Sequence, residues 1–224
     1  MTKGVPKRLA AIHRRKAGTT MTRIKICGIR RIQDVQAVNY LQPEYAGFVF
    51  APSKRQVSIQ TAEDLSRRLH PSICPVGVYV NAEKKEIMEA AGAGVIRAVQ
   101  LHGTESRQQV RELKYCLPEG TLIIKAVRME DAHALQEWMD SEADYLLLDA
   151  KNAGGGETFD HELITAAGTI GKPWFLAGGM NADNVLPAIR RFAPYGIDVS
   201  SGVETAGYKD IRKMETLIRR VRYE

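Results

Sequence analysis

The stretch RIKICGIRRIQDVQAVNYLQPEYAGFVF, residues 23–50, holds two strand-like runs on either side of one helical pattern. The runs at 23–27 and 45–50 are short and rich in Ile, Val, Phe and Tyr, which is typical of buried parallel strands. Between them, residues 32–41 repeat apolar side chains at helical spacing. The stretch therefore predicts one strand–helix–strand unit of an α/β fold.

The same unit recurs from Met21 onward, with a strand-like run about every 25 residues. The six further runs are PVGVYV (75–80), VIRAVQL (95–101), TLIIKAV (121–127), DYLLLD (144–149), PWFLAG (173–178) and GIDVSS (196–201). Eight units in about 200 residues predict a closed (β/α)8 TIM barrel in a single domain. An open doubly wound sheet more often has about five to seven units and carries Gly-x-Gly-x-x-Gly after its first strand, a fingerprint that is missing here.

The segments between the runs carry local helix signals. Helical patterns and their expected N-caps are 62–70 after Thr61, 82–92 after Asn81, and 160–168, which begins with Asp160 itself. The last pattern, 208–222, has one apolar stripe made of Ile211, Met214, Leu217, Ile218 and Val221. Pro187 falls near the second turn of the helical pattern before it, so we expect that helix to be bent or delayed.

The basic charge of the chain is confined to its first twenty residues. The net charge is +6, from 32 basic and 26 acidic residues. Residues 1–20 contain six basic residues and no acidic one, so residues 21–224 are neutral. Such a segment could be an arm that binds nucleic acid or a membrane surface. We expect instead a basic, disordered leader at 1–20, no nucleic-acid partner, and a catalytic barrel at 21–224, because Met21 opens the first structured segment.

The cysteines and histidines predict neither disulfides nor metal. Cys27, Cys74 and Cys116 lie far apart without a CxxC pair, which disfavours a disulfide framework or a zinc site and fits a reducing compartment. The five histidines are equally scattered. No apolar run approaches the roughly 20 residues that span a bilayer. We therefore expect a cytoplasmic protein without a metal and without a membrane partner.

Polar residues and glycines gather at the ends of the predicted strands. In a (β/α)8 barrel the catalytic groups cluster at the carboxyl ends of the strands. Those ends carry Cys27-Gly28, the residues after Phe50, Val80-Asn81, 100–103, Asp149, Gly178-Gly179 and 200–202. The coincidence predicts an active site at this end of the barrel.

Two glycine-containing loops, AGGMN (177–181) and SSGVE (200–204), follow the seventh and eighth runs. Free N–H groups ahead of a helix attract anions, and phosphate-binding barrels use the loops after strands seven and eight. Ordinary turn glycines explain either loop alone. The pair on adjacent strands favours a phosphate site.

Three side chains are candidates for chemistry, and each has a structural alternative. Asp149 follows the apolar run YLLL, so partial desolvation could raise its pKa toward that of a general acid; it could equally cap the next loop. Cys27 shares a strand face with Lys25, whose ammonium favours the thiolate; it could instead be a small buried thiol. Arg55 could grip a carboxylate with a bidentate fork, or be an ordinary surface arginine.

Seven motifs taken together resemble the phosphoribosylanthranilate isomerase family of tryptophan biosynthesis. They are KICGIR (25–30), GFVFAPSKR (47–55), VGVYVN (76–81), VQLHG (99–103), LLLDA (146–150) with GGGETFD (154–160), LAGGMNADNV (176–185), and GIDVSSGVE (196–204) with GYKD (207–210). Single motifs such as QLHG are unspecific. All seven in order, covering 22–221, are highly specific.

The resemblance implies a cofactor-free Amadori rearrangement of N-(5-phosphoribosyl)anthranilate to 1-(2-carboxyphenylamino)-1-deoxyribulose 5-phosphate. Asp149 would be the general acid that opens the furanose ring to an iminium, and Cys27 the general base that takes the C2′ proton. Arg55 would hold the anthranilate carboxylate, Asp198 would contact the substrate near its amine, and His102 would line the site. The residues expected to bind the phosphate are Gly178, Gly179, Ser200, Ser201 and Gly202.

Two departures and several alternatives accompany this resemblance. In GGGETFDH (154–161), Glu157 stands where the family commonly has Lys or Gln, and His161 where it commonly has Trp. We expect Glu157 to face solvent, because it would repel an anionic substrate. The alternatives are another phosphosugar isomerase or epimerase barrel and a non-catalytic phosphosugar-binding module. The only partner we expect is the small-molecule substrate, for a monomer or a homodimer; activity on a histidine-pathway substrate stays open.

Overall fold

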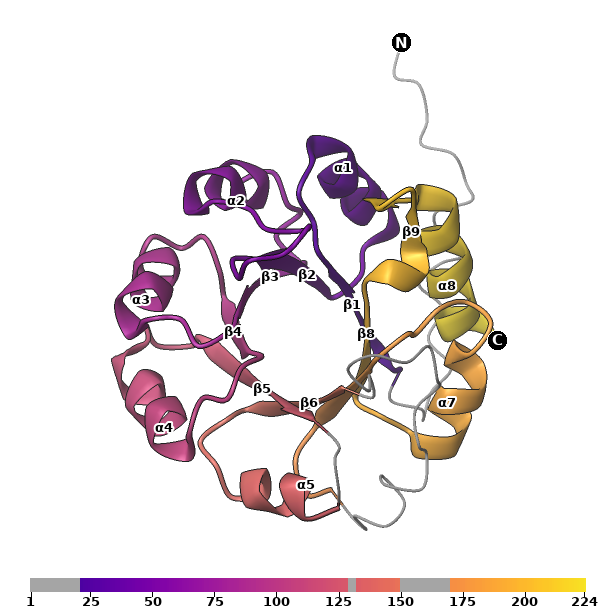
Figure 1. The fold of residues 1–224 in the computed structure, drawn as a ribbon. Helices are drawn as coiled ribbons and strands as arrows, with labels where there is room; N and C mark the ends of the chain where they lie inside the picture. The colour runs from indigo at the N-terminus through magenta and orange to yellow at the C-terminus, as the bar shows by residue number, and fades with distance from the viewer. Residues whose placement is uncertain (1–20, 129–131, 150–169) are drawn as a thin grey trace.

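The closed barrel predicted by the eight runs is present in the computed structural model, which describes residues 21–128, 132–149 and 170–224 (Figure 1). Its strands pair in parallel and in sequence order, and β1 pairs with both β2 and β8, which closes the ring. The strands are β1 (Arg23–Cys27), β2 (Tyr45–Val49), β3 (Cys74–Tyr79), β4 (Ala98–Leu101), β5 (Leu122–Arg128), β6 (Tyr145–Asp149), β7 (Trp174–Ala177) and β8 (Gly196–Val199).

Helices surround the barrel on its outer side (Figure 1). In the described part of the chain they are α1 (Ile32–Leu41), α2 (Ile59–Ser66), α3 (Lys84–Gly92), α4 (Arg107–Cys116), α5 (Ala132–Met139), α7 (Val185–Phe192) and α8 (Ile211–Tyr223). Between β8 and α8 lie a short 3₁₀ helix, η2 (Ser201–Val203), and a two-stranded ribbon of β9 (Glu204–Thr205) and β10 (Tyr208–Lys209). The alternation of strand and helix confirms the expected (β/α)8 fold.

Two apolar clusters divide the barrel into an outside and an inside. Side chains such as Ile24 and Ile26 of β1 belong to the large cluster between the sheet and the helices. Residues of alternate register fill the interior, for example Leu147 on β6 and Phe175 on β7. Because side chains alternate across a strand, these clusters show which residues of every strand face inward.

Aromatic rings fill the part of the interior formed by the first residues of the strands. Phe175 packs edge-on against Tyr45 at 5.3 Å between ring centroids, and Tyr145 and Tyr195 close around it. Nearer the carboxyl ends the inward side chains are polar, including Lys25 and Gln100. The aromatic side chains thus fill the interior at the amino ends of the strands, and the polar side chains that could take part in a reaction lie nearer the carboxyl ends.

The local helix signals were only partly right. Ser58, and not Thr61, caps α2, because its Oγ accepts the backbone N–H of Thr61 at 3.1 Å. Asn81 does not cap α3, because the residue directly before that helix is Glu83. Asn81 has a positive φ of 50°, and its Oδ1 accepts the N–H of Thr104 at 2.8 Å. Asp160 lies outside the described residues. Short polar side chains near a helix start compete for several backbone donors, so the sequence alone did not choose among them.

The two expectations for the carboxyl-terminal helices hold in part. Helix α7 begins at Val185, so Pro187 lies in its first turn, where a backbone N–H would have no partner within the helix. Helix α7 thus starts late enough in the segment for Pro187 to lie in its first turn. In α8 the stripe residues Met214, Leu217 and Ile218 are buried, whereas Ile211 is 45% exposed.

Candidate active site

Cys27 and Asp149 occupy the inward register at the carboxyl ends of β1 and β6. On β1 the outward residues Ile24 and Ile26 join the outer cluster, so Lys25 and Cys27 face the interior. On β6 Leu147 belongs to the interior cluster, and Asp149 follows it by two residues. The barrel therefore directs both side chains toward the same end of its interior.

A buried ion pair lies directly beneath Cys27. Lys25 is fully buried, and its Nζ lies 2.8 Å from Oδ1 of Asp198 on the neighbouring β8. Burial alone would lower the pKa of Lys25, but the carboxylate of Asp198 beside it raises the pKa. Lys25 is thus a buried ammonium at neutral pH.

The thiol of Cys27 is not activated in the way that its neighbour Lys25 suggested. Burial of the thiol raises its pKa and outweighs the opposing effect of the Lys25 charge. The carboxylate of Asp198 adds to the rise, because it offsets the ammonium that favours the thiolate. Of the two readings of Cys27 that the sequence left open, the raised pKa favours the buried thiol for the protein without substrate.

A chain of hydrogen bonds leads from the interior to Asp149. Nε2 of His102 lies 3.1 Å from Oδ2 of Asp149, and Nδ1 of His102 lies 2.8 Å from Nε2 of Gln100. With the Gln100 amide in this orientation its nitrogen donates to Nδ1, and the tautomer that matches this contact carries its proton on Nε2, toward Asp149. Gln100 is 1% exposed, and its Oε1 lacks a hydrogen-bond partner in the described part of the chain.

Arg55, from the loop after β2, lies across the start of the loop after β1. Its Nε is 2.7 Å from Oε1 of Glu204 and its Nη2 is 2.8 Å from Oε2, a bidentate ion pair. Nζ of Lys209 lies 2.8 Å from the same Oε1. Burial would raise the pKa of Glu204, but hydrogen bonds from Arg55 and Lys209 lower it to about 2. Glu204 is therefore an anion held between two cations.

The loops after β7 and β8 pack against each other. A Cβ built on Gly202 would lie 2.0 Å from the carbonyl oxygen of Met180, so only glycine fits at this contact. Gly178 and Gly179 have φ values of 90° and 65°. Ser200 donates from its Oγ to the carbonyl oxygen of Cys27 at 3.1 Å. These contacts bring the two expected phosphate loops beside the strand that carries Cys27.

Some expectations fall outside this geometry. Glu157 and His161 lie beyond the described residues. Within 21–128, 132–149 and 170–224, no three His, Cys, Asp or Glu side chains are grouped to hold a metal ion. No helix in the same ranges is long and apolar enough to cross a bilayer.

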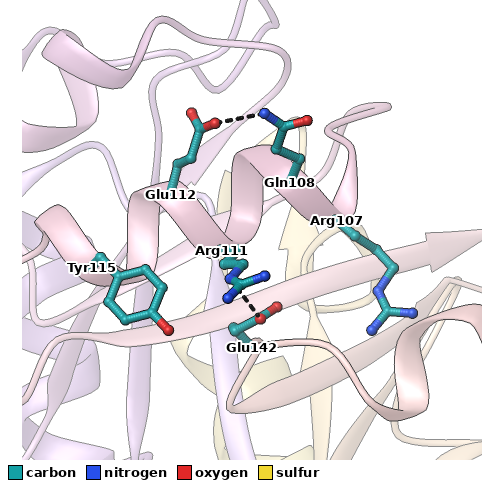
Figure 2. Close-up of a pocket in the computed structure, with 6 residues that line it drawn as sticks. All are labelled: Arg107, Gln108, Arg111, Glu112, Tyr115 and Glu142. Carbon is teal, nitrogen blue, oxygen red and sulfur yellow. Dashed lines mark hydrogen bonds and ion pairs between the residues drawn. The ribbon is translucent and has the colours of Figure 1, made fainter.

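A surface depression on α4 is separate from this site. Figure 2 shows its lining, in which five of the six residues come from α4 and the Arg111 Nε lies 3.5 Å from Oε1 of Glu142. Tyr115 on the same face is 75% exposed. The depression therefore belongs to the outer, solvated side of the helix ring and not to the barrel interior.

Comparison with known proteins identifies the family. The family model described as N-(5'phosphoribosyl)anthranilate (PRA) isomerase matches residues 24–220. The chain belongs to the phosphoribosylanthranilate isomerase family. The match covers all eight strands except the first residue of β1, so family membership applies to the whole barrel.

Individual members of this isomerase family are similar over nearly their full lengths. The N-(5'-phosphoribosyl)anthranilate isomerase of Acetivibrio thermocellus is 41% identical over an alignment of 210 positions that covers 90% of this chain and 96% of the relative. A crystal structure of monomers of the dimeric phosphoribosylanthranilate isomerase from Thermotoga maritima is 35% identical with a TM-score of 0.79, and covers 90% of this chain and 98% of that one. A further crystal structure, of a phosphoribosyl anthranilate isomerase in complex with reduced 1-(o-carboxyphenylamino)-1-deoxyribulose 5-phosphate, is 35% identical with a TM-score of 0.78. It covers 90% of this chain and 98% of that one.

Sequence reasoning missed three residues of this isomerase-family site. Gln100 faces the interior two residues before His102, a position that period-two alternation could have indicated. Glu204 and Lys209 lie within the motifs GIDVSSGVE and GYKD, but nothing local pairs them with Arg55. Their roles depend on contacts that only the closed barrel creates.

Proposed function

We propose that this member of the phosphoribosylanthranilate isomerase family carries out the Amadori rearrangement with Asp149 as general acid and Cys27 as general base. The reaction belongs to tryptophan biosynthesis. The observation that carries the proposal is the inward register of both side chains at the carboxyl end of the barrel, with the loops after β7 and β8 beside Cys27. The rearrangement needs only proton transfers, so a carboxyl and a thiol suffice.

Asp149 begins the reaction by protonating the furanose ring oxygen of phosphoribosylanthranilate. The bond from that oxygen to C1′ breaks, and the lone pair of the anthranilate nitrogen forms the iminium. The N–H at Nε2 of His102, 3.1 Å from Asp149, then stabilises the carboxylate that remains. His102 thus supports the proton transfer instead of carrying it out.

Cys27 removes the C2′ proton once the iminium has formed. Its raised pKa makes it a thiol before substrate binds. The positive iminium lowers the pKa of the thiol beside it, so that Cys27 releases its own proton to solvent and becomes the thiolate. The iminium also acidifies C2′, so a base of modest strength suffices. The electrons of the C–H bond form the enolamine, and this tautomerises to the ketone.

Binding groups surround these two residues. Arg55 holds the anthranilate carboxylate, because one edge of its guanidinium is free of Glu204 and can form a second bidentate pair. Asp198 lies beside the substrate near its amine, held in place by its ion pair with Lys25. The phosphate lies on the loops after β7 and β8, against Gly178, Gly179, Ser200, Ser201 and Gly202.

Two finer expectations accompany the mechanism. The chain acts as a monomer or a homodimer on this small molecule, with no nucleic-acid partner. Its scattered cysteines fit a cytoplasmic, reducing location. A size-exclusion and light-scattering measurement of the whole chain distinguishes the two assembly states.

Turnover of phosphoribosylanthranilate, followed by the loss of its anthranilate-type fluorescence, tests the proposal. Cys27→Ser and Asp149→Asn should each lower kcat by about 10² or more. The matched controls are Cys116→Ser and Asp64→Asn, which change exposed side chains on the outer helices and should keep the original kcat. Unchanged kcat in both site variants would refute the assignment.

A further inference from the structure

The Arg55 guanidinium is held by Glu204, and Glu204 forms a buried ion pair with Lys209. We propose that Glu204 and Lys209 are positioning residues that aim the free edge of Arg55 at the substrate carboxylate. The inference rests on the carboxylate-binding role proposed for Arg55 and adds how that role is achieved.

Counting the donors of Arg55 shows which edge has no partner among the described residues. A guanidinium has five N–H donors, and Glu204 accepts one from Nε at 2.7 Å and one from Nη2 at 2.8 Å. The donors left over are on Nη1 and on the other side of Nη2, which together form one edge of the fork. That edge can donate two hydrogen bonds to a carboxylate in the same bidentate geometry.

The stem of Arg55 is confined as well. A Cβ built on Gly28 would lie 2.5 Å from Cδ of Arg55. The arginine side chain therefore packs directly against Gly28, the residue after Cys27. A side chain fixed at its stem and along one edge keeps few rotamers. The cost of ordering it is therefore met before the substrate arrives.

Glu204 is itself held in place by Lys209. The two residues face each other across the β9–β10 ribbon, and Nζ of Lys209 lies 2.8 Å from Oε1 of Glu204. Lys209 is 1% exposed as a side chain and Glu204 is 7% exposed, so water competes little with the pair. A buried carboxylate with two cationic partners is a rigid anchor for the guanidinium.

Lys209 also connects the Arg55–Glu204 pair to the loop after β8 and to β1. Nζ of Lys209 donates to the carbonyl oxygen of Ser200 at 3.0 Å, and Ser200 donates to the carbonyl oxygen of Cys27. One network thus joins the group that binds the anthranilate end, a loop expected at the phosphate end, and the strand of the base. Displacing Glu204 should disturb the position of Arg55 first.

Charge alone predicts the opposite result from positioning, which makes the inference testable. Glu204→Gln removes one negative charge near an anionic substrate, so electrostatics by itself would tighten binding and lower KM. If Glu204 positions Arg55, the loss of the bidentate anchor raises KM by about tenfold or more while kcat changes only a few-fold. The sign of the change in KM separates the two explanations.

A double-mutant cycle completes the experiment on the full-length chain. KM and kcat are measured for Glu204→Gln, Arg55→Ala and the double variant, with Glu142→Gln as the control. Glu142 pairs with Arg111 on the outer face of α4 (Figure 2), so its replacement breaks an Arg–Glu pair outside the site and should leave KM unchanged. In the Arg55→Ala background, adding Glu204→Gln should change KM by less than about twofold, because no guanidinium is left to aim.

Each result either supports or overturns the inference. A raised KM in Arg55→Ala with an unchanged or lowered KM in Glu204→Gln overturns positioning and leaves the role of Arg55 intact. An unchanged KM in Arg55→Ala removes the carboxylate role itself and the inference with it. If Glu204→Gln does not fold, Glu204→Asp replaces it: this variant keeps the charge, but its shorter side chain cannot reach both nitrogens, so KM should still rise.

Discussion

Replacing Gly28 by alanine should weaken substrate binding through Arg55, without touching any group that reacts. Gly28 follows Cys27 and has a φ of 88°, a conformation that L side chains rarely adopt. A Cβ at this position would lie 2.5 Å from Cδ and 3.4 Å from Nε of Arg55. Because a real Cβ does not tolerate the shorter distance, the arginine stem has to move.

The structure supplies both a magnitude and a control. Gly94 also has a positive φ, 71°, but a Cβ built there meets no atom of the described residues within 4 Å. Alanine at either position should cost roughly 1–2 kcal/mol of backbone strain. For a chain of this size that lowers Tm by roughly 2–8 °C in both variants. Only Gly28→Ala should also displace the charge-assisted hydrogen bonds from Arg55 to the substrate carboxylate. These are worth about 1.5–3 kcal/mol, so the KM of this variant should rise about tenfold to hundredfold.

Steady-state turnover and thermal melting of the two variants decide the matter. We expect a loss of Tm in both variants, with KM raised in Gly28→Ala and unchanged in Gly94→Ala. Equal KM values in the two variants would show that moving the Arg55 stem does not matter, and the reasoning would be wrong.

Two further predictions concern stability. Ser58→Ala should cost about 1 kcal/mol in a urea titration because it removes the cap of α2, whereas Thr61→Ala, in the first turn, should cost less; the reverse order would contradict the cap assignment. The pKa of Glu204 is depressed to about 2 from an ordinary 4.5, so its stabilising effect is complete above pH 4.5 and lost as pH falls toward 2. The stability difference between the original chain and Glu204→Gln should therefore shrink across that interval, and a constant difference would contradict the pKa.

The barrel could be predicted from the sequence because its strands are buried on both faces. Runs such as 45–50 and 145–148 are apolar throughout, which separates them from the amphipathic helices between them. The placement of Cys27 and Asp149 followed from the same strand ends. Helix caps were less predictable, since Ser58 and Thr61 are both capable caps and lie within one turn of each other.

The electrostatics of the site depend on residues distant in sequence. Lys25 and Cys27 were rightly placed on one strand face, but the partner of Lys25 is Asp198, 173 residues away. The carboxylate that anchors Arg55 is 149 residues away. No local pattern records such pairs or the depth of burial, and these two factors set the direction of the Cys27 pKa shift.

Single-turnover rates with substrate deuterated at C2′ test the division of labour between acid and base most directly. If Cys27 takes the C2′ proton, Cys27→Ser makes C–H cleavage the slow step and should show a large primary isotope effect. If Asp149 opens the ring, Asp149→Asn makes ring opening slow, and its isotope effect should be close to unity. Equal isotope effects in the two variants, or a large one only in Asp149→Asn, would contradict the mechanism.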